Sequence, residues 1–239
     1  MVLRFFLFAS LFLFVSCHTV ERDNPDDPNS KNYGKDDSSG SSINYGSIYY
    51  VSQTYKTVVI GEQTWMAENL NYGAALDTKC YSYINTNCNK YGRLYNWAAA
   101  MDLPASCNSS SCKELVTEKH KGICPNGWHI PNTEDMLTLM DYIEYQKSCS
   151  ECAGKYLKTE KAWLGGESKN AFGFSALPGG YYRDDSKGFH EMMESGVWQI
   201  AEEYDDEHTY YMILRYDLDF LGAGYDSKKH LLSVRCLKN

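Results

Sequence analysis

Three stretches of the chain hold side chains that catalysis or metal binding would use. The first is CPNGWHIPNTEDM, residues 124–136, which brings Cys124 and His129 close to two carboxylates. A cysteine nucleophile with a histidine base is one interpretation, but such a cysteine needs a free thiolate in a tuned environment. The same stretch reads as a Pro-Asn-Gly turn, a short strand and a helix start. We therefore predict that it is scaffold.

The elements of this stretch assign each side chain a structural role. Strand alternation places Trp128 and Ile130 on one face and His129 on the other, outward face. Asn132 is a good helix N-cap, and the acidic residues after it suit the positive end of the helix dipole. Cys124 is then a disulfide cysteine rather than a nucleophile.

The second stretch, Cys149-Ser-Glu-Cys152, has the spacing of a thiol-disulfide motif. A thioredoxin-like interpretation requires the pair at a helix N-terminus after a strand, whereas here it follows a predicted helix in a polar segment. A zinc site is also disfavoured because the cysteine spacings do not repeat as two such units. We predict a small structural disulfide, and a redox protein is the alternative.

The third stretch, AEEYDDEH at residues 201–208, is the most acidic window of the predicted domain. Its carboxylates would suit Ca²⁺, but it lacks EF-hand spacing and the Glu-Pro-Asn or Trp-Asn-Asp triplets of sugar-binding C-type lectins. We expect a solvated loop, with no metal ion and no cofactor. Aromatic rings beside carboxylates can also stack on and hydrogen-bond a sugar. The candidate ligand-binding residues are Trp198, Tyr204, Asp205, Asp206 and Glu207.

Composition and missing motifs exclude several other functions. The formal charge of −8 and the lack of a basic stripe argue against nucleic-acid binding. The sequence has no Gly-rich phosphate loop, no HExxH and no GxSxG. We predict no catalysis, although two carboxylates across a cleft, as in glycosidases, keep an envelope hydrolase as an alternative.

The N-terminus predicts export to the bacterial envelope. Arg4 precedes the apolar run 5–15, which is too short to span a bilayer, and the run ends at Ser16-Cys17. We predict a lipoprotein signal peptide over residues 1–17 and a lipid anchor on Cys17, at the outer membrane or cell surface. An ordinary signal peptide cut nearby is the alternative. Residues 18–47 are polar and acidic, which indicates a disordered linker.

Cysteine usage agrees with export. Eight cysteines remain besides Cys17, and an even number in an exported chain favours disulfides. Spacing suggests three local pairs and leaves the two remaining cysteines to each other. The predicted pairs are Cys80 with Cys88, Cys107 with Cys112, Cys149 with Cys152, and Cys124 with Cys236.

Periodicity predicts the elements that position these residues. Residues 55–70 read as a strand, a two-residue turn at Gly61-Glu62 and a second strand. Apolar spacing predicts one helix within 91–101 and another from Asn132 onward. Strand candidates follow at 196–204, 209–217 and 230–238. The fold class is therefore α+β: one disulfide-stapled domain over residues 48–239, with two helices, a small antiparallel sheet and long irregular loops.

Five motifs carry a family resemblance: WMAENLNY, YGRLYNWAAAM, CPNGWHIPNTEDM, GFSALPGGYY and SVRCLKN. In this order, from about Val59 to the end, they resemble the Fibrobacter succinogenes major paralogous domain, a family of exported bacterial proteins. The resemblance implies a fold and a location rather than a reaction. The GWHIP strand with its acidic helix start also resembles the core of C-type lectins and of formylglycine-generating-enzyme-like domains. We expect a cell-surface lipoprotein with a non-catalytic binding or adhesion module, whose ligand is a glycan or a surface protein.

Overall fold

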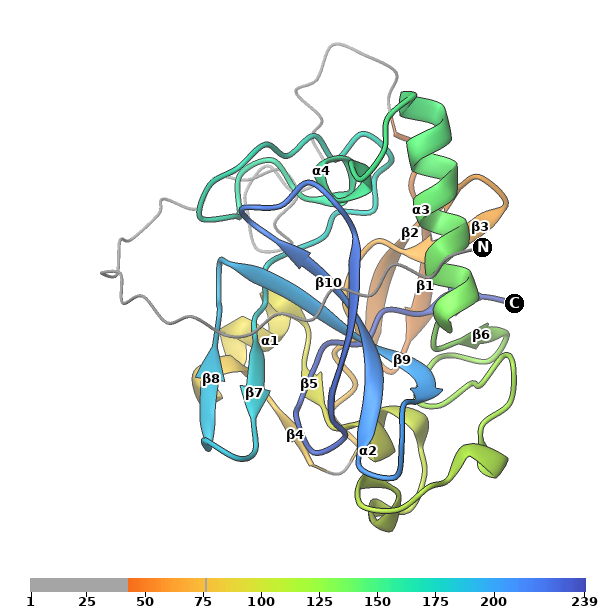
Figure 1. Ribbon diagram of the computed structural model, residues 1–239, viewed down its shortest axis with the longest axis vertical. Helices are drawn as coiled ribbons and strands as arrows, with labels where there is room; N and C mark the ends of the chain where they lie inside the picture. The colour runs from red at the N-terminus through yellow and green to blue at the C-terminus, as the bar shows by residue number, and fades with distance from the viewer. Residues whose placement is uncertain (1–42, 76) are drawn as a thin grey trace.

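The computed structural model describes residues 43–75 and 77–239. The predicted signal peptide, Cys17 and most of the predicted linker lie outside the described residues. Within them the chain forms antiparallel sheets and four helices, so the α+β class is confirmed (Figure 1). The first strand begins at Gly46, and Ile43 and Tyr45 pack against the core. The packed part of the chain therefore extends into the predicted linker, ahead of Ile48.

The largest sheet has the strand order β1-β2-β3-β12-β6, so the C-terminal residues pair between two segments from earlier in the chain. Gly61 and Glu62 join β2 to β3, as predicted, and Gly61 has a positive φ of 62°. Leu237 lies opposite both Trp65 and His129. The strands of this sheet are β1 (Gly46–Tyr50), β2 (Gln53–Ile60), β3 (Gln63–Met66), β6 (Trp128–His129) and β12 (Leu237–Lys238).

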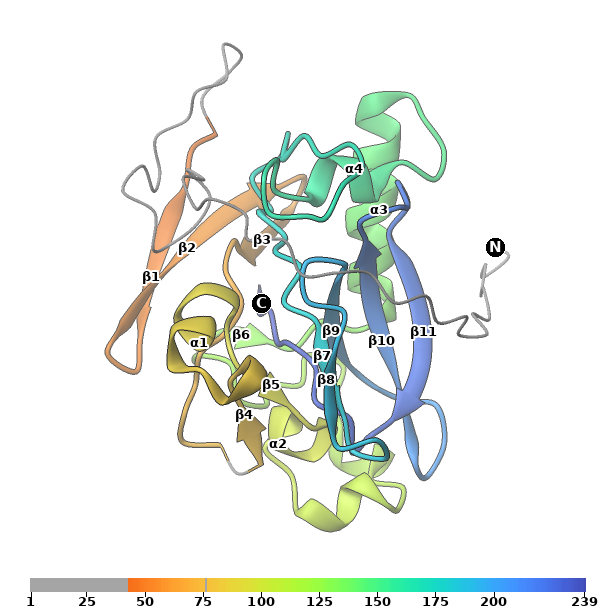
Figure 2. The same ribbon diagram turned by 90° about the vertical axis from the view of Figure 1, so that its left-hand side faces the viewer.

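A second sheet, with the order β11-β10-β9, lies across the molecule from β1 and β2 (Figure 2). Its strands are β9 (Ser195–Glu203), β10 (His208–Arg215) and β11 (Gly222–Ser227). Two-stranded pairs complete the architecture: β4 (Thr78–Lys79) with β5 (Leu94–Tyr95), and β7 (Tyr181–Arg183) with β8 (Gly188–His190). The strand predicted over 230–238 is wrong except for β12, because Leu231, Leu232 and Ser233 make single bridges to three different segments.

The described residues contain four α-helices rather than the two predicted: α1 (Asn85–Tyr91), α2 (Trp97–Met101), α3 (Thr133–Lys147) and α4 (Ala153–Leu157). Helices α1 and α4 span 7 and 5 residues, too few to show an apolar period. Helix α2 begins after Asn96, because Leu94 belongs to β5.

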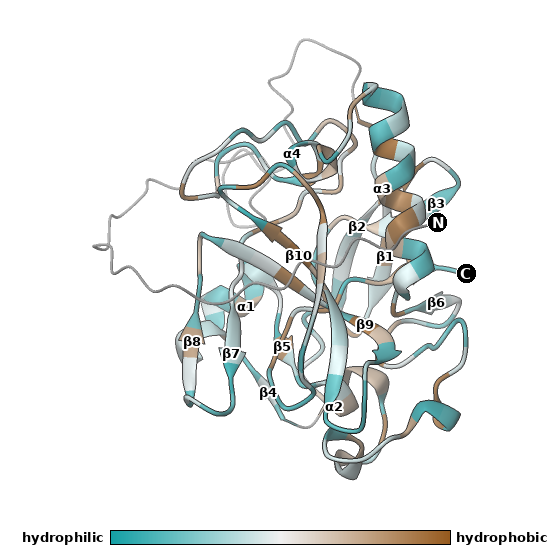
Figure 3. Cartoon of the chain, viewed as in Figure 1, coloured by the Kyte–Doolittle hydropathy of each residue, from teal (hydrophilic) through white to brown (hydrophobic). Residues whose placement is uncertain are grey.

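Helix α3 confirms the predicted cap. The Asn132 side chain accepts a hydrogen bond from the Asp135 N–H, and the Asp135 carboxylate accepts one from the Asn132 N–H. The buried face of α3, with Leu139 and Ile143, joins a core that includes β9 and β10. Brown bands on α3 in Figure 3 mark its apolar residues.

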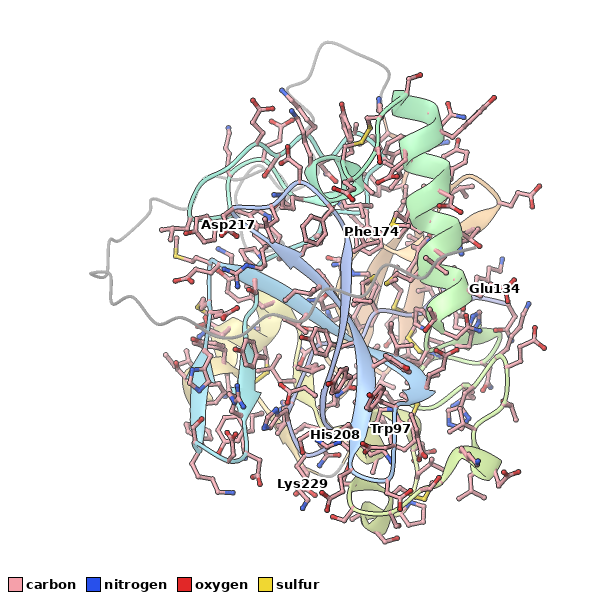
Figure 4. The ribbon with its side chains drawn as sticks, viewed as in Figure 1. Trp97, Glu134, Phe174, His208, Asp217 and Lys229 are labelled. Atoms are coloured by element: carbon pink, nitrogen blue, oxygen red, sulfur yellow. A yellow bond between two sulfur atoms is a disulfide. The ribbon has the colours of Figure 1, made fainter. Side chains whose placement is uncertain are left out.

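Two large hydrophobic cores and a small cluster of Leu94, Tyr182 and Leu231 fill the described part of the domain. The first lies between α3, the second sheet and the 157–177 segment, and it contains Phe174 and Trp198. The second surrounds Trp97 and contains the Cys124–Cys236 disulfide. Figure 4 shows Phe174 in the upper half of the molecule and Trp97 in the lower half. Both cores draw residues from distant parts of the chain, as non-local β pairing requires.

All four predicted cysteine pairs are joined: Cys80–Cys88, Cys107–Cys112, Cys124–Cys236 and Cys149–Cys152. Three of them close short loops. The Cys124–Cys236 bridge has a sequence separation of 112 and is fully buried. It ties the segment before β6 to the segment before β12.

The predicted outward position of His129 is wrong, because its side chain is buried with 1% exposure. Its Nδ1 lies 2.7 Å from the Asn239 Oδ1, and its Nε2 lies 3.2 Å from the Asp135 Oδ2. The C-terminal residue and the helix cap therefore cover the second face of β6. His129 is a structural residue, as the scaffold interpretation of this stretch predicts.

Arg235 occupies the centre of the fold and is 1% exposed. Its guanidinium donates to the Asn69 Oδ1 at 2.8 and 3.0 Å and to the Phe174 carbonyl. It lies 4.3 Å from the Phe174 ring centroid and 5.6 Å from that of Trp198. The Trp198 indole N–H also donates to the Asn69 Oδ1, at 2.8 Å. One buried cation thus holds four distant segments together.

Candidate functional site

An open cleft of about 570 Å³ lies where three segments meet: the loop after Cys107–Cys112, the N-terminus of α3, and the turn from β9 to β10. Carboxylates dominate its lining, accompanied by hydroxyl groups, an amide, one lysine and one aromatic ring. The lining residues are Ser111, Lys113, Val116, Thr117, Glu118, Asn132, Glu134, Ala201, Glu202, Glu203, Tyr204, Asp205 and Asp206.

Glu203 holds the first wall of the cleft in place. Its carboxylate accepts the Cys112 N–H at 2.6 Å and the Ser111 hydroxyl at 2.7 Å. The Lys228 ammonium lies 2.9 Å from the Glu203 Oε1, and the two side chains are 0% and 6% exposed. A buried ion pair therefore fixes the disulfide loop to the end of β9.

Lys228 uses its other donors on the same region. It donates to the Asp206 carbonyl at 2.9 Å and to the Ser110 carbonyl at 3.3 Å. Its ammonium lies 4.8 Å from the Trp97 ring centroid. Lys228 therefore connects the second core to two walls of the cleft.

Asn132 and Thr133 at the start of α3 connect the third wall to the other two. The Thr133 hydroxyl donates to the Glu202 Oε2, and the Asn132 Nδ2 donates to the Glu118 carbonyl at 3.1 Å. Asn132 also caps α3. The residue that starts the helix thus positions the cleft.

Two cleft carboxylates have lowered pKa values. Burial raises the pKa of Glu203, but the hydrogen bonds from Cys112 and Ser111 and the Lys228 charge outweigh it, so the pKa is below its ordinary value. The pKa of Asp205 is lowered by the Glu207 N–H and by the His208 side chain, which lies 2.8 Å away. Both groups are held in the ionised form.

Tyr204 is the aromatic side chain of the cleft and is 47% exposed. It stacks on Tyr225, with ring centroids 4.0 Å apart and an interplanar angle of 7°. Tyr210 meets it edge-on at 5.4 Å and packs against the first core. The exposed ring of Tyr204 is therefore backed by two others and held in a fixed orientation.

The structure brings together three of the predicted ligand-binding residues, Tyr204, Asp205 and Asp206. Glu207 is exposed next to them but does not line the cleft. Trp198 is a correction: it is 1% exposed and lies in the first core, so its ring cannot meet a surface ligand. Residues 195–201 of β9 are buried on both faces of the strand, so Trp198 lies inside, while Tyr204 lies beyond the end of the strand.

Sequence analysis missed the other two walls of the cleft. Ser111, Thr117 and Glu118 come from the disulfide loop, and Asn132 and Glu134 from the start of α3. The Cys107–Cys112 pair predicts a stapled loop and Asn132 predicts a helix cap, but neither pattern indicates that these residues line a cleft. The position of that loop beside β9 depends on the long-range Glu203 and Lys228 contacts.

Residues 43–75 and 77–239 contain no group of three or more His, Cys, Asp or Glu side chains arranged to hold a metal ion. The same part of the chain has no helix with the length and apolarity to cross a bilayer.

Comparison with known proteins gives one match. The family model described as the Fibrobacter succinogenes major domain matches residues 58–238. No curated protein and no solved structure matches the chain.

Proposed function

The chain belongs to the Fibrobacter succinogenes major domain family, and we propose that it is a cell-surface lipoprotein whose domain binds a glycan in the cleft without catalysis. The observation that carries this proposal is the half-exposed Tyr204 ring, backed by Tyr225 and set beside hydrogen-bond acceptors. A pyranose ring offers an apolar face to an aromatic side chain and hydroxyl groups to carboxylates and amides.

The charge of the cleft indicates the class of glycan. Six of its lining residues are Asp or Glu and one is Lys. Lys228 does not line the cleft, and the only cleft carboxylate it neutralises is Glu203. The negative potential repels polyanionic sugars and accepts neutral ones, because like charges at a binding surface are unfavourable.

The pKa shifts of two cleft carboxylates favour binding over hydrolysis. A glycosidase needs one carboxylic acid with a raised pKa to protonate the leaving group. The shifts at Glu203 and Asp205 go the other way. Glu203 is also committed to three structural partners, which suits a fixed hydrogen-bond acceptor.

Export and anchoring are part of the proposal. Residues 1–17 have the pattern of a lipoprotein signal peptide ending in Cys17, and the acidic linker tethers the domain to the envelope. Four disulfides suit an oxidising compartment. We also propose a lectin-like topology, in which loops on one side of small antiparallel sheets build the ligand site.

A neutral-glycan array with the full-length chain tests the function. We expect binding to at least one neutral oligosaccharide, weakened about tenfold by Tyr204→Ala, which corresponds to about 1.4 kcal/mol. Tyr145→Ala is the matched control, because Tyr145 is 81% exposed on α3 and lies outside the cleft. No binding above the denatured protein, or equal binding by Tyr204→Ala, refutes the proposal. Binding of an envelope protein at the same residues would identify the alternative ligand.

A further inference from the structure

Another exposed aromatic side chain, Tyr83, stands on a turn with two left-handed residues. The Cys80–Cys88 disulfide closes a loop in which the Ile84 N–H bonds to the Tyr81 carbonyl at 3.2 Å. The two central residues of this turn, Ser82 and Tyr83, have φ values of 53° and 58°. Turns with two consecutive left-handed residues normally use Asn and Gly.

Burial does not compensate this backbone strain. Each left-handed residue other than glycine costs about 1–3 kcal/mol when the surroundings impose it. Tyr83 is 68% exposed and Ile84 is 50% exposed, so packing of these side chains does not offset the strain. The turn therefore presents the Tyr83 ring to solvent.

Other rings and a cation hold Tyr83 in place. Phe189 of β8 meets Tyr83 edge-on at 5.0 Å and also contacts Tyr81 and Tyr182, at 4.9 and 5.0 Å. The Lys79 ammonium lies 5.7 Å from the Tyr83 ring centroid and 5.1 Å from that of Tyr182. The described residues place no carboxylate within ion-pair distance of Lys79. Its charge therefore remains available beside the exposed ring.

The segment that carries Tyr83 is more basic than the cleft. Residues 78–101 contain Lys79, Lys90 and Arg93 and no Asp or Glu, although Asp77 and Asp102 flank the segment. The loop and hairpin β7–β8 lie at the left of Figure 1, whereas the 111–118 loop of the cleft lies at the lower right. The two features therefore lie on different parts of the surface.

We propose that Tyr83 and Lys79 form a second glycan site, which binds an acidic sugar. The sugar ring stacks on the exposed Tyr83 ring, and its carboxylate pairs with the Lys79 ammonium. The Cys80–Cys88 disulfide and the left-handed turn hold the ring in its binding orientation before the ligand arrives, which lowers the entropic cost of binding. This site goes beyond the proposed neutral-glycan cleft and does not depend on it.

Binding of the full-length chain to polygalacturonate, measured by affinity electrophoresis, tests the proposal. We expect Tyr83→Ala and Lys79→Met each to weaken binding about tenfold. Tyr83→Phe keeps the ring and should keep the affinity. The matched controls, Tyr145→Ala and Lys161→Met, remove an exposed ring and an exposed charge elsewhere on the surface and should bind like the wild type.

The Tyr204→Ala variant tests the acidic-sugar site separately from the proposed neutral-glycan cleft. It should retain polygalacturonate binding while losing any neutral glycan, so the two sites can fail independently. The acidic-sugar site is refuted if the wild type does not bind polygalacturonate, or if Tyr83→Ala binds as tightly as the wild type. Loss of binding in Lys79→Met alone would indicate attraction by charge only and would also refute it. If Tyr83 is required for binding to anionic lipid vesicles and polygalacturonate does not bind, the ligand is a membrane surface and the acidic-sugar proposal is refuted.

Discussion

Replacing Lys228 by methionine tests whether a buried ion pair supports the cleft. The ammonium is fully buried, lies 2.9 Å from the Glu203 carboxylate, and donates to the Asp206 and Ser110 carbonyls. Methionine preserves most of the side-chain volume beside Trp97 but removes the charge and all of these hydrogen bonds. Glu203 then remains nearly buried without its cation.

The expected loss of stability is large for a single substitution. At an effective dielectric constant of about 20, unit charges separated by the observed 2.9 Å attract by about 6 kcal/mol. Desolvation offsets much of this in the intact pair, whereas removing one partner of a buried pair costs about 3–5 kcal/mol. For a domain of this size, that loss lowers Tm by roughly 6–20 °C.

Urea unfolding with intact disulfides measures the effect, together with Lys228→Met/Glu203→Gln. The glutamine still accepts the Cys112 N–H but carries no charge, so the double variant should recover at least half of the loss. Lys187→Met is the control, because the Lys187–Asp184 pair is exposed, and it should leave the midpoint unchanged. A Lys228→Met variant within about 1 kcal/mol of the wild type, or no recovery in the double variant, would refute the reasoning.

The same pair predicts a dependence on pH. The pKa of Glu203 is lowered in the folded protein, so its contribution to stability is complete above the unfolded pKa of about 4.3. That contribution is lost as pH falls through the lowered pKa. The stability gap between wild type and Lys228→Met should therefore shrink below about pH 4, because a protonated Glu203 needs no cation.

Three further predictions concern the cysteines. Replacing both Cys124 and Cys236 by alanine should lower the free energy of unfolding by about 4–5 kcal/mol, measured in urea, because their bridge closes the longest loop; a loss under about 1 kcal/mol would contradict this. Thiol titration of native, unreduced protein should find Cys149 and Cys152 oxidised, and ready reduction of this pair would support the redox alternative. Cys17→Ser should abolish incorporation of a labelled fatty acid, and incorporation into that variant would exclude Cys17 as the anchor.

Local sequence patterns predicted the helices and strands that are fixed by contacts between residues close together in the chain. The β2–β3 hairpin follows from Gly61, and α3 follows from its Asn132 cap and apolar period. The disulfide pairing could also be predicted from the sequence, because three short cysteine spacings leave a single remaining pair. In each case the deciding interaction joins residues close together in the chain, or the pair is assigned by elimination.

The cleft and the buried polar residues depend on long-range contacts that no local pattern contains. Glu203 and Lys228 look like solvated charges in the sequence, yet folding buries both. Trp198 looks like a ring beside an acidic loop, but β9 is buried on both faces at this position, so the ring lies in the core. His129 alternates with two apolar residues, and the C-terminal Asn239 covers the face on which it lies.

Arg235 gives a physical reason for the joint occurrence of motifs that are far apart in the chain. Burial lowers the pKa of its guanidinium to about 9, so keeping it charged is costly. Its acceptors are neutral: the Asn69 amide oxygen and two carbonyls of the 174–175 segment. Phe174 and Trp198 supply the rings. The ENL and GFS triplets therefore supply acceptors to the one buried cation of the VRC triplet, and losing either would leave guanidinium donors unpaired. This shared requirement concerns the fold rather than ligand binding.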